Sequence, residues 1–179
     1  YFSLIEKLEK TNEEEIFDGF NKLRLMMSGS AALAPEIHKK WELLTGQKIL
    51  ERYGMTEVGM ALSNKIDGER RPGAVGEPLP NVEIKLEDEN GKEITEEGEA
   101  GQILIKGPQV FIEYQNLPDK TEESFKDNWF LTGDIAVMED GYYRLLGRDS
   151  IDIIKSGGYK ISALEIEDVL LKNQNIKEC

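Results

Sequence analysis

A strand–helix–strand pattern near the start of the chain limits the folds it can adopt more than any other feature. The mostly apolar run Leu23–Met27 stops at Ser28-Gly29-Ser30, as a buried strand does when it ends in a tight loop. A helix is expected over Pro35–Thr45, because proline suits its first turn and Gly46 its end, and Ile49–Leu50 begins a second strand. The short links between these elements predict a βαβ unit of a parallel sheet.

Two loops of this unit fall at the carboxyl ends of its strands, where parallel sheets bind ligands. The first, Ser28–Ala32, consists of small residues that would let a ligand approach the backbone and a helix N-terminus. It has no phosphate-loop lysine, so it could equally be a tight strand-to-helix link. The second, Tyr53–Glu57, combines an aromatic ring, a hydroxyl and a carboxylate, the parts that a magnesium–nucleotide site needs. On residue types alone, a turn with a surface glutamate is the simpler interpretation.

The pattern changes after Arg71-Pro72-Gly73, where apolar and polar residues begin to alternate as in strands with one buried face. Two pairs of such runs are each joined by an Asn-Gly or Asp-Gly hairpin signal. The pairs are Val82–Leu86 with Gln102–Lys106, turning at Asn90-Gly91, and Ile135–Met138 with Tyr142–Leu146, turning at Asp140-Gly141. This part of the sequence therefore predicts a small antiparallel sheet or barrel.

A third kind of pattern begins near residue 151. A strand is expected over Ile151–Ile154 and a helix over Ser162–Leu171, where Ser162 and Glu165 have the spacing of a capping box. The sequence thus divides into three predicted parts: residues 1–71 with the βαβ unit, residues 72–148 with the antiparallel sheet, and residues 149–179.

Composition excludes several classes of protein. Hydrophobic residues make up 39% of the chain and charged residues 32%, which is typical of a globular protein. The net charge of −13, with no basic stripe to offset it, argues against a nucleic-acid partner. A single cysteine, Cys179, excludes an internal disulfide framework and a cysteine-rich zinc site. No apolar run approaches the roughly 20 residues that span a membrane. The single cysteine fits a reducing compartment, so we expect an intracellular protein, and the sequence leaves a mitochondrial and a cytoplasmic location both open.

Other polar groups carry weaker signals. Thr132-Gly133-Asp134 is predicted to be a turn between two strands, whose carboxylate could accept hydrogen bonds from two ribose hydroxyls. Gly147-Arg148 is a similar signal, and Ser156–Lys160, beside Lys155, could contact a phosphate or form a polar hairpin. His38 lies in a Lys-rich stretch and is predicted to be a surface residue. No catalytic Ser/His/Asp or Cys/His arrangement and no metal-ligand cluster can be built from these residues.

The order of the motifs is more specific than any one of them. In sequence they are Glu51-Arg-Tyr-Gly-Met-Thr-Glu57, Pro72-Gly-Ala-Val-Gly-Glu-Pro-Leu-Pro80, Gly107-Pro108 with Tyr114, Trp129-Phe-Leu-Thr-Gly-Asp134, Gly147-Arg148 and the run from Gly157-Gly158 to Glu167. Together they resemble the adenylate-forming superfamily of acyl-CoA synthetases, luciferases and peptide-synthetase adenylation domains. The form Arg-Tyr-Gly-Met-Thr-Glu, with Ser-Gly-Ser-Ala-Ala before it, is most similar to the malonyl-CoA synthetase branch.

The resemblance implies a partial adenylate-forming fold: the end of a large AMP-binding domain with its β-barrel subdomain, and the start of a mobile C-terminal domain. The family's phosphate loop and adenylation lysine would lie outside residues 1–179. The isolated chain is therefore expected to be inactive, although the full-length protein would be a ligase.

The resemblance also implies a role for each matching residue. In the nucleotide site, Gly29, Ser30, Ala31 and Ala32 would line the adenine pocket, Tyr53 would stack on the base, Thr56 would contact a phosphate, Glu57 would hold Mg²⁺, and Asp134 would bind the ribose with Arg148 beside it. Four residues would face coenzyme A: Gly157, Gly158, Tyr159 and Lys160. Lys155 aligns with a lysine that acts in the second half-reaction of some relatives. The expected catalytic residues are Thr56, Glu57 and Lys155.

The implied reaction joins a small carboxylic acid to coenzyme A through an acyl-adenylate, at the expense of ATP. For malonate or methylmalonate, the second carboxylate needs a cation, and Arg52 is the candidate, with Ser28 nearby. Two alternatives remain at this point. The first is a non-catalytic nucleotide-binding or interaction module of the same fold, and the second is an adenylating enzyme whose acceptor is a carrier-protein thiol.

Overall fold

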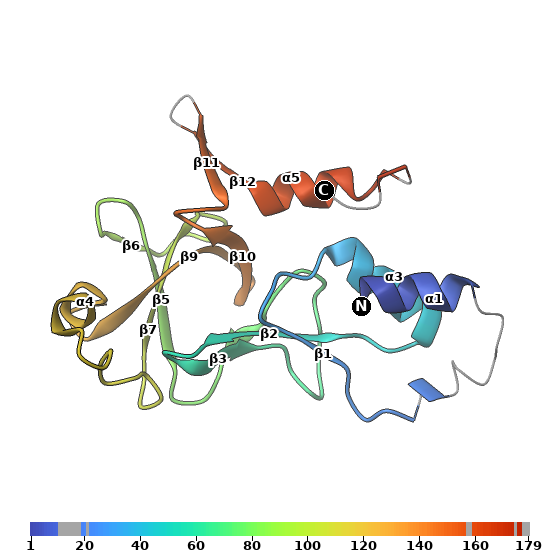
Figure 1. Cartoon of the computed structure of the whole chain (residues 1–179), viewed down its shortest axis with the longest axis horizontal. Coiled ribbons are helices and arrows are strands. Elements are labelled where there is room, and N and C mark those ends of the chain that lie inside the picture. The colour runs from blue at the N-terminus through green and yellow to red at the C-terminus, as the bar shows by residue number, and fades with distance from the viewer. Residues whose placement is uncertain (11–18, 21, 157–158, 174, 177–179) are drawn as a thin grey trace.

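The computed structural model describes residues 1–10, 19–20, 22–156, 159–173 and 175–176. It has the α/β content with a small antiparallel, barrel-like part that the resemblance implies (Figure 1). None of the helices in the described part of the chain has the length and hydrophobicity that a membrane-spanning helix needs.

A four-stranded sheet, in the order β1-β2-β3-β4, carries the first part of the chain. Strands β1 and β2 are parallel and α3 connects them, so the predicted βαβ unit is confirmed. The bounds are β1 Met27–Ser28, α3 Pro35–Thr45, β2 Leu50–Met55, β3 Gly59–Ser63 and β4 Glu77–Pro78. Gly46 ends α3 in the left-handed region, at φ 70°, as the sequence predicts. Strand β2 continues through Gly54 to Met55.

A separate core lies beside this sheet, where α1 (Phe2–Lys10) packs on α3. Trp41 is fully buried between Ile5, Leu8 and Ile49. The expected buried strand at residues 23–27 is only partly present, because β1 begins at Met27, whose side chain is 50% exposed. The physical reason is that β1 is the outer strand of this sheet among the described residues.

The second sheet is antiparallel, in the order β10-β9-β7-β5-β6, and it curls like an open half-barrel (Figure 1). Short strand β8 pairs with β9 and follows helix α4. The predicted hairpin at Asp140-Gly141 is confirmed, since β9 and β10 pair on either side of it. The bounds are β5 Glu83–Glu87, β6 Glu93–Ile94, β7 Gly101–Lys106, α4 Pro118–Glu123, β8 Phe125–Lys126, β9 Trp129–Glu139 and β10 Tyr142–Arg148.

The other predicted hairpin is wrong in its connection. Strands β5 and β7 do pair, with Ile84 opposite Ile105, but the turn at Asn90-Gly91 leads into β6 instead. Strand β6 takes one edge of β5 and β7 takes the other. A turn signal indicates that the chain reverses, and the short strand directly after the turn is the one that pairs.

The last part of the chain is a hairpin and a helix: β11 (Ile153–Ser156), β12 (Tyr159–Ser162) and α5 (Ala163–Leu170). The strand expected over Ile151–Ile154 is shifted by two residues. Ser162 caps α5 as predicted, because its Oγ accepts a hydrogen bond from the Glu165 N–H at 3.2 Å. The same hydroxyl donates to the Leu146 carbonyl at 2.6 Å, which ties the helix to β10.

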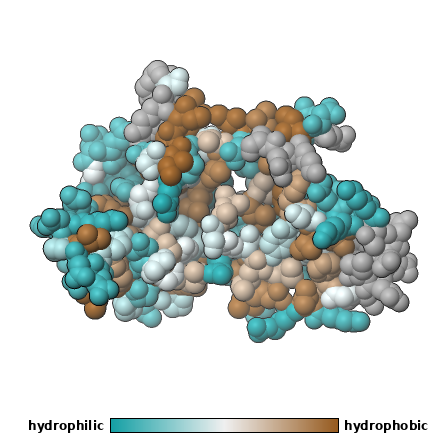
Figure 2. Space-filling view, viewed as in Figure 1, coloured by the Kyte–Doolittle hydropathy of each residue, from teal (hydrophilic) through white to brown (hydrophobic). Residues whose placement is uncertain are grey.

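Helix α5 lies above the space between the half-barrel and the α1–α3 pair (Figure 1). Figure 2 shows hydrophobic side chains gathered over α5. Ile161 of β12 and Ile166 and Val169 of α5 are exposed. The barrel core itself is formed by fully buried residues such as Leu62, Ile103 and Ile105. Residues from all three parts of the chain line a common cleft beneath α5.

Candidate functional site

A cleft of about 500 Å³ lies where the three parts meet. Its walls come from the loop after β1, the end of β2, the middle of β9, the end of β10 and the start of α5. It brings together most of the predicted nucleotide residues, Ser30, Ala31, Ala32, Tyr53, Thr56, Glu57, Asp134 and Arg148, with Arg52, the candidate for the second carboxylate of the acid. Sequence reasoning missed its apolar wall of Val75, Leu145 and Leu164, because isolated aliphatic residues give no functional signal.

Asp134 is the most constrained carboxylate in the cleft. Tyr53 Oη donates to its Oδ2 at 2.6 Å, and Arg148 Nε lies 3.3 Å from its Oδ1. Burial raises the pKa of Asp134, although the Tyr53 hydroxyl and the Arg148 guanidinium oppose that effect. Burial, followed by the charge of Asp134, also raises the pKa of Tyr53, so its phenol stays protonated and remains a donor.

A bulge in β9 places Asp134 in the cleft. Gln102 pairs with Ile135 and Leu104 with Leu131, so Thr132–Asp134 lie together opposite Ile103. Gly133 has φ 75°, which a glycine adopts without strain, and Thr132 Oγ accepts the Asp134 N–H at 3.1 Å. The prediction of a turn between two strands is therefore wrong. The three residues form a bulge within strand β9, and the Asp134 side chain lines the cleft.

Arg148 lies directly across from Asp134 on the neighbouring strand β10. Its N–H donates to Asp152 Oδ2 at 2.8 Å, which holds the backbone where β10 ends. Gly147 has φ 115°, and a Cβ there would lie 2.4 Å from the Asp152 Cβ. Gly147 and Asp152 thus form a tight corner that fixes Arg148 beside Asp134, and the sequence motif Gly147-Arg148 reflects this requirement.

Glu57 lies in the turn after β2. Its Oε1 accepts a hydrogen bond from Tyr114 Oη at 2.9 Å, and its carbonyl accepts the Phe111 N–H at 2.7 Å. Thr56 beside it is exposed. Among the described residues, no cluster of three or more acidic, histidine or cysteine side chains could hold a metal. A lone carboxylate fits Mg²⁺ only when phosphate oxygens and water supply the other ligands, which is how Mg²⁺ binds with nucleotides.

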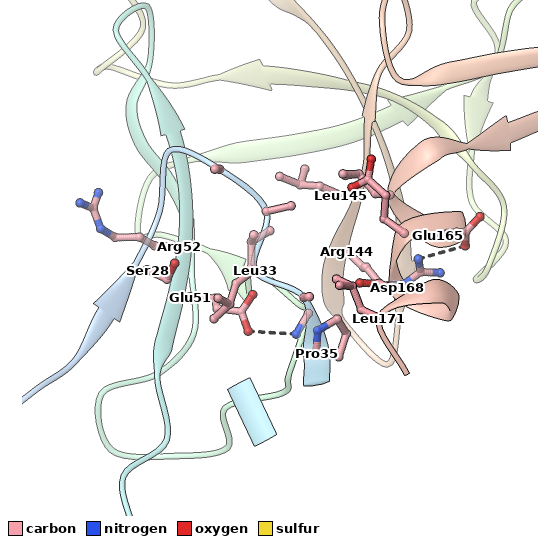
Figure 3. A pocket seen from close by; sticks show the side chains of 17 residues that line it. Ser28, Leu33, Pro35, Glu51, Arg52, Arg144, Leu145, Glu165, Asp168 and Leu171 are labelled. Carbon is pink, nitrogen blue, oxygen red and sulfur yellow. Dashed lines mark hydrogen bonds and ion pairs between the residues drawn. The ribbon is translucent and has the colours of Figure 1, made fainter. Parts of the chain in front are cut away.

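Arg52 extends along the cleft wall, and Figure 3 shows its guanidinium pointing away from Glu51 and Asp168. Its Nη1 contacts the Met60 sulfur, and its Nε has no hydrogen-bond partner among the residues that the structure describes. Gly29 lies against it, because a Cβ there would be 3.3 Å from the Arg52 Cγ. Gly29 thus permits the loop to pack on Arg52. Gly29, which was predicted to line the adenine pocket, does not line the cleft.

A second cavity of about 200 Å³ adjoins the cleft, between the loop at residues 31–35 and α5 (Figure 3). Ser28 lines this cavity rather than the larger cleft. Glu51 and Asp168 line it too, and Arg144 forms an ion pair with Glu165 at 3.1 Å. Burial raises the pKa of Asp168.

His38 contradicts its prediction as a surface residue. Its side chain is fully buried, and its Nδ1 lies 2.8 Å from Glu51 Oε1, which also accepts the Gly73 N–H at 2.9 Å. Burial raises the pKa of Glu51, while the hydrogen bond from His38 opposes the rise. The signal that could have found this pair is the spacing of His38 and Trp41, which share the buried face of α3.

The residues expected to face coenzyme A lie on the hairpin of β11 and β12. Lys155 pairs with Lys160 across it, and Ser156 pairs with Tyr159. Gly157 and Gly158 lie outside the described residues. The expected polar hairpin is thus present, and the roles of its residues stay predictions.

Comparison with known proteins gives a family and several close relatives. The AMP-binding enzyme family matches residues 3–115. The chain is 51% identical over 177 residues to the malonate–CoA ligase of Arabidopsis thaliana, covering 97% of this chain and 28% of that enzyme. It is 48% identical over 177 residues to the mitochondrial malonate–CoA ligase of Bos taurus, covering 88% of this chain and 30% of that enzyme. The chain therefore spans less than a third of the length of these relatives.

A solved structure agrees with the sequence relatives. A malonyl-CoA ligase in a ternary product complex with methylmalonyl-CoA and AMP superposes with a TM-score of 0.76 at 43% identity, covering 99% of this chain and 38% of that one. The family match spans more than half of the chain. The chain belongs to the AMP-binding enzyme family.

Proposed function

We propose that this chain is part of an ATP-dependent acid–CoA ligase that activates malonate or methylmalonate. One observation carries the proposal: residues from three separated segments, including Glu57, Asp134 and Arg148, converge on a single cleft. The relatives named as malonate–CoA ligases support the acid, and the product complex with methylmalonyl-CoA and AMP supports both the thiol and the nucleotide.

In this proposal ATP occupies the larger cleft. Tyr53 lies beside the adenine, with Gly29–Ala32 supplying the loop around it, and Thr56 contacts a phosphate. Asp134 binds the ribose hydroxyls, using the lone pairs that remain after the contacts of Tyr53 and Arg148. Glu57 holds Mg²⁺, which when bound would offset charge on the phosphate oxygens.

The reaction has two steps. An oxygen of the substrate carboxylate attacks the α-phosphorus of ATP, the bond to pyrophosphate breaks, and an acyl-adenylate forms. The thiol of coenzyme A then attacks the acyl carbonyl carbon and loses its proton, and AMP leaves. This chain contributes to the first step by orienting the nucleotide and by placing positive charge near the reacting groups.

The second step assigns roles to the hairpin. We propose that Tyr159 and Lys160, with Gly157 and Gly158, face the arm of coenzyme A, and that Lys155 acts in thioester formation. Residues 1–71 and 72–148 would then be portions of the nucleotide-binding domain, and residues 149–179 the hinge and start of a mobile domain. The contacts of α5 with β10, through Ser162 and Arg144, would form and break as that domain moves.

The bovine relative is described as mitochondrial, which supports a mitochondrial location, with the cytoplasm as the alternative. The acid must be small and carry a second carboxylate. We propose that Arg52 binds that carboxylate, with Ser28 nearby, because the Arg52 side chain lines the cleft and forms no ion pair with any residue that the structure describes.

A segment exchange tests the proposed function. The aligned 177 residues of the Arabidopsis ligase would be replaced by this chain, and formation of malonyl-CoA, AMP and pyrophosphate would be followed. We expect all three products to depend on malonate, ATP, Mg²⁺ and coenzyme A together, with acetate a poor substrate. A folded chimera that binds ATP but releases no pyrophosphate with any dicarboxylic acid would overturn the proposal.

A further inference from the structure

Tyr114 contacts Glu57 through its hydroxyl, although the two residues lie 57 positions apart in the sequence. We propose that Tyr114 is a positioning residue, which holds the Glu57 carboxylate in the orientation that binds Mg²⁺ together with ATP. The inference rests on the proposed function, because that function gives Glu57 its metal. Tyr114 is absent from the lining of the cleft, so it would act through Glu57 rather than on the substrates.

The tyrosine is fixed by contacts that do not involve Glu57. Its backbone N–H donates to Thr121 Oγ at 2.9 Å, and the Lys120 ammonium lies 4.8 Å from the centre of its ring. The ring of Phe111 packs against it with centroids 4.7 Å apart. The hydroxyl is therefore held in place before a metal or nucleotide arrives.

A second tether acts on the backbone of the same residue. The Phe111 N–H donates to the Glu57 carbonyl at 2.7 Å. The segment around Phe111 and Tyr114 thus holds Glu57 at two points, one on the main chain and one at the end of the side chain. Together they restrict the rotation of a glutamate that follows the exposed Thr56 in a turn.

The direction of the side-chain hydrogen bond suits a metal ligand. Tyr114 Oη is the donor and Glu57 Oε1 the acceptor, at 2.9 Å, as expected for a phenol beside a carboxylate. Because Tyr114 takes Oε1, the second oxygen of Glu57 is left to face a cation. Carboxylates that bind metals are commonly oriented by such a donor, and its loss costs about 10- to 100-fold in metal affinity or activity.

A purely structural role would give a different result from the proposed one. Tyr114→Phe removes only the hydroxyl, and the ring keeps its packing with Phe111 and its contact with Lys120. The fold should therefore survive, and the effect should be confined to events that need the metal.

The test measures ATP binding by calorimetry, once with excess Mg²⁺ and once with EDTA, on the complete ligase that carries this segment. Wild type is expected to bind ATP more tightly with Mg²⁺, and Glu57→Gln should lose that gain. The gain is the ratio of the ATP affinity with Mg²⁺ to the ATP affinity with EDTA. Tyr114→Phe should reduce this ratio about 10-fold and leave the ATP affinity in EDTA unchanged. Tyr142→Phe is the matched control, since it removes the same group from a residue outside the cleft lining, and its gain should equal that of wild type.

Three results would overturn the inference. If Tyr114→Phe keeps the full gain from Mg²⁺, the hydroxyl does not position the metal ligand, and the proposed function stands. If the affinity in EDTA falls as much as the affinity in Mg²⁺, Tyr114 supports the whole cleft rather than Glu57. If wild-type ligase gains nothing from Mg²⁺, the role of Glu57 in the proposed function fails, and that of Tyr114 fails with it.

Discussion

Arg52 follows the buried Glu51 on β2 and precedes Tyr53, so a single strand presents a buried carboxyl group, a cation without an ion-pair partner among the described residues, and a proposed nucleotide contact in succession. The cation lies on the wall of the larger cleft. Its fork of donors matches a carboxylate, and hydrogen bonds to charged groups contribute about 1.5–3 kcal/mol. These features support the proposed role of Arg52 in selectivity for the acid substrate rather than in ATP binding.

Arg52→Ala is predicted to raise the KM for malonate about 10- to 100-fold, because the distal carboxylate loses its partner. The affinity for ATP should change little. Steady-state kinetics with malonate and calorimetry with ATP measure the two effects separately. Arg24→Ala, which removes an exposed arginine outside the cleft lining, is the control. Equal losses for malonate and ATP would contradict a role in selecting the acid.

The His38–Glu51 pair shows how a buried hydrogen-bonded pair supports the same strand. Glu51 Oε1 links α3 through His38 to the loop at Gly73, and its carbonyl accepts two hydrogen bonds from Asn64. Removing one member of a buried pair costs about 3–5 kcal/mol, because the other is left without a partner. We expect this pair to fix the position of β2 ahead of the cleft.

The pair gives a prediction for the pH dependence of stability. The pKa of Glu51 is higher in the folded state than in the unfolded state. The contribution of Glu51 to the free energy of unfolding is therefore complete below the unfolded-state pKa and is lost as pH rises through the folded-state pKa. Glu51→Gln does not titrate, so the unfolding midpoint of the ligase, followed by calorimetry across this range, should fall less steeply with pH than in wild type. Glu9→Gln, in an exposed pair with Lys40, should follow wild type. Identical slopes for wild type and Glu51→Gln would contradict the shift.

Among elements, the bulge in β9 has the largest effect on the site. It places Asp134 across from Arg148 and within reach of Tyr53, and it depends on Gly133 at φ 75°. A Cβ at Gly133 would meet no atom within 4 Å, so a substitution there changes the backbone preference without a clash.

Gly133→Ala is predicted to cost about 1–2 kcal/mol in stability, because a non-glycine residue is strained in the left-handed region. If strain flattens the bulge, Asp134 turns away, and the affinity for ATP falls about 10-fold or more. Gly98→Ala is a matched control: it has φ 80°, equally open surroundings and no place in the cleft lining. It should lose similar stability and bind ATP normally, and an equal loss of ATP affinity in both variants would count against the bulge.

Some of these elements were readable from the sequence and some were not. The βαβ unit and the cap at Ser162 could be predicted because both depend on local spacing in the sequence, and the structure confirms them. The bulge at Gly133 carries the same Thr-Gly-Asp letters as a turn, and only pairing with β7 distinguishes the two. The contacts Tyr114–Glu57 and His38–Glu51 join residues distant in sequence, which periodicity and composition do not report.

At the scale of the whole molecule, the cleft exists because α5 is held over the two larger sheets. Ser162 bonds to Leu146, Arg144 pairs with Glu165, and Leu164 enters the cleft wall. The sequence predicted three parts in this order, and the structure adds that their loops converge at one place (Figure 1). We propose that a nucleotide binds at this convergence.

A crystal structure of the ligase that carries this segment, with a non-hydrolysable malonyl-adenylate analogue, tests that claim most directly. We expect ribose hydroxyls within hydrogen-bond distance of Asp134, the adenine between Tyr53 and the Gly29–Ala32 loop, and the free carboxylate of the malonyl group at Arg52. An analogue bound elsewhere, or in this cleft with its ribose away from Asp134, would contradict the proposed binding site.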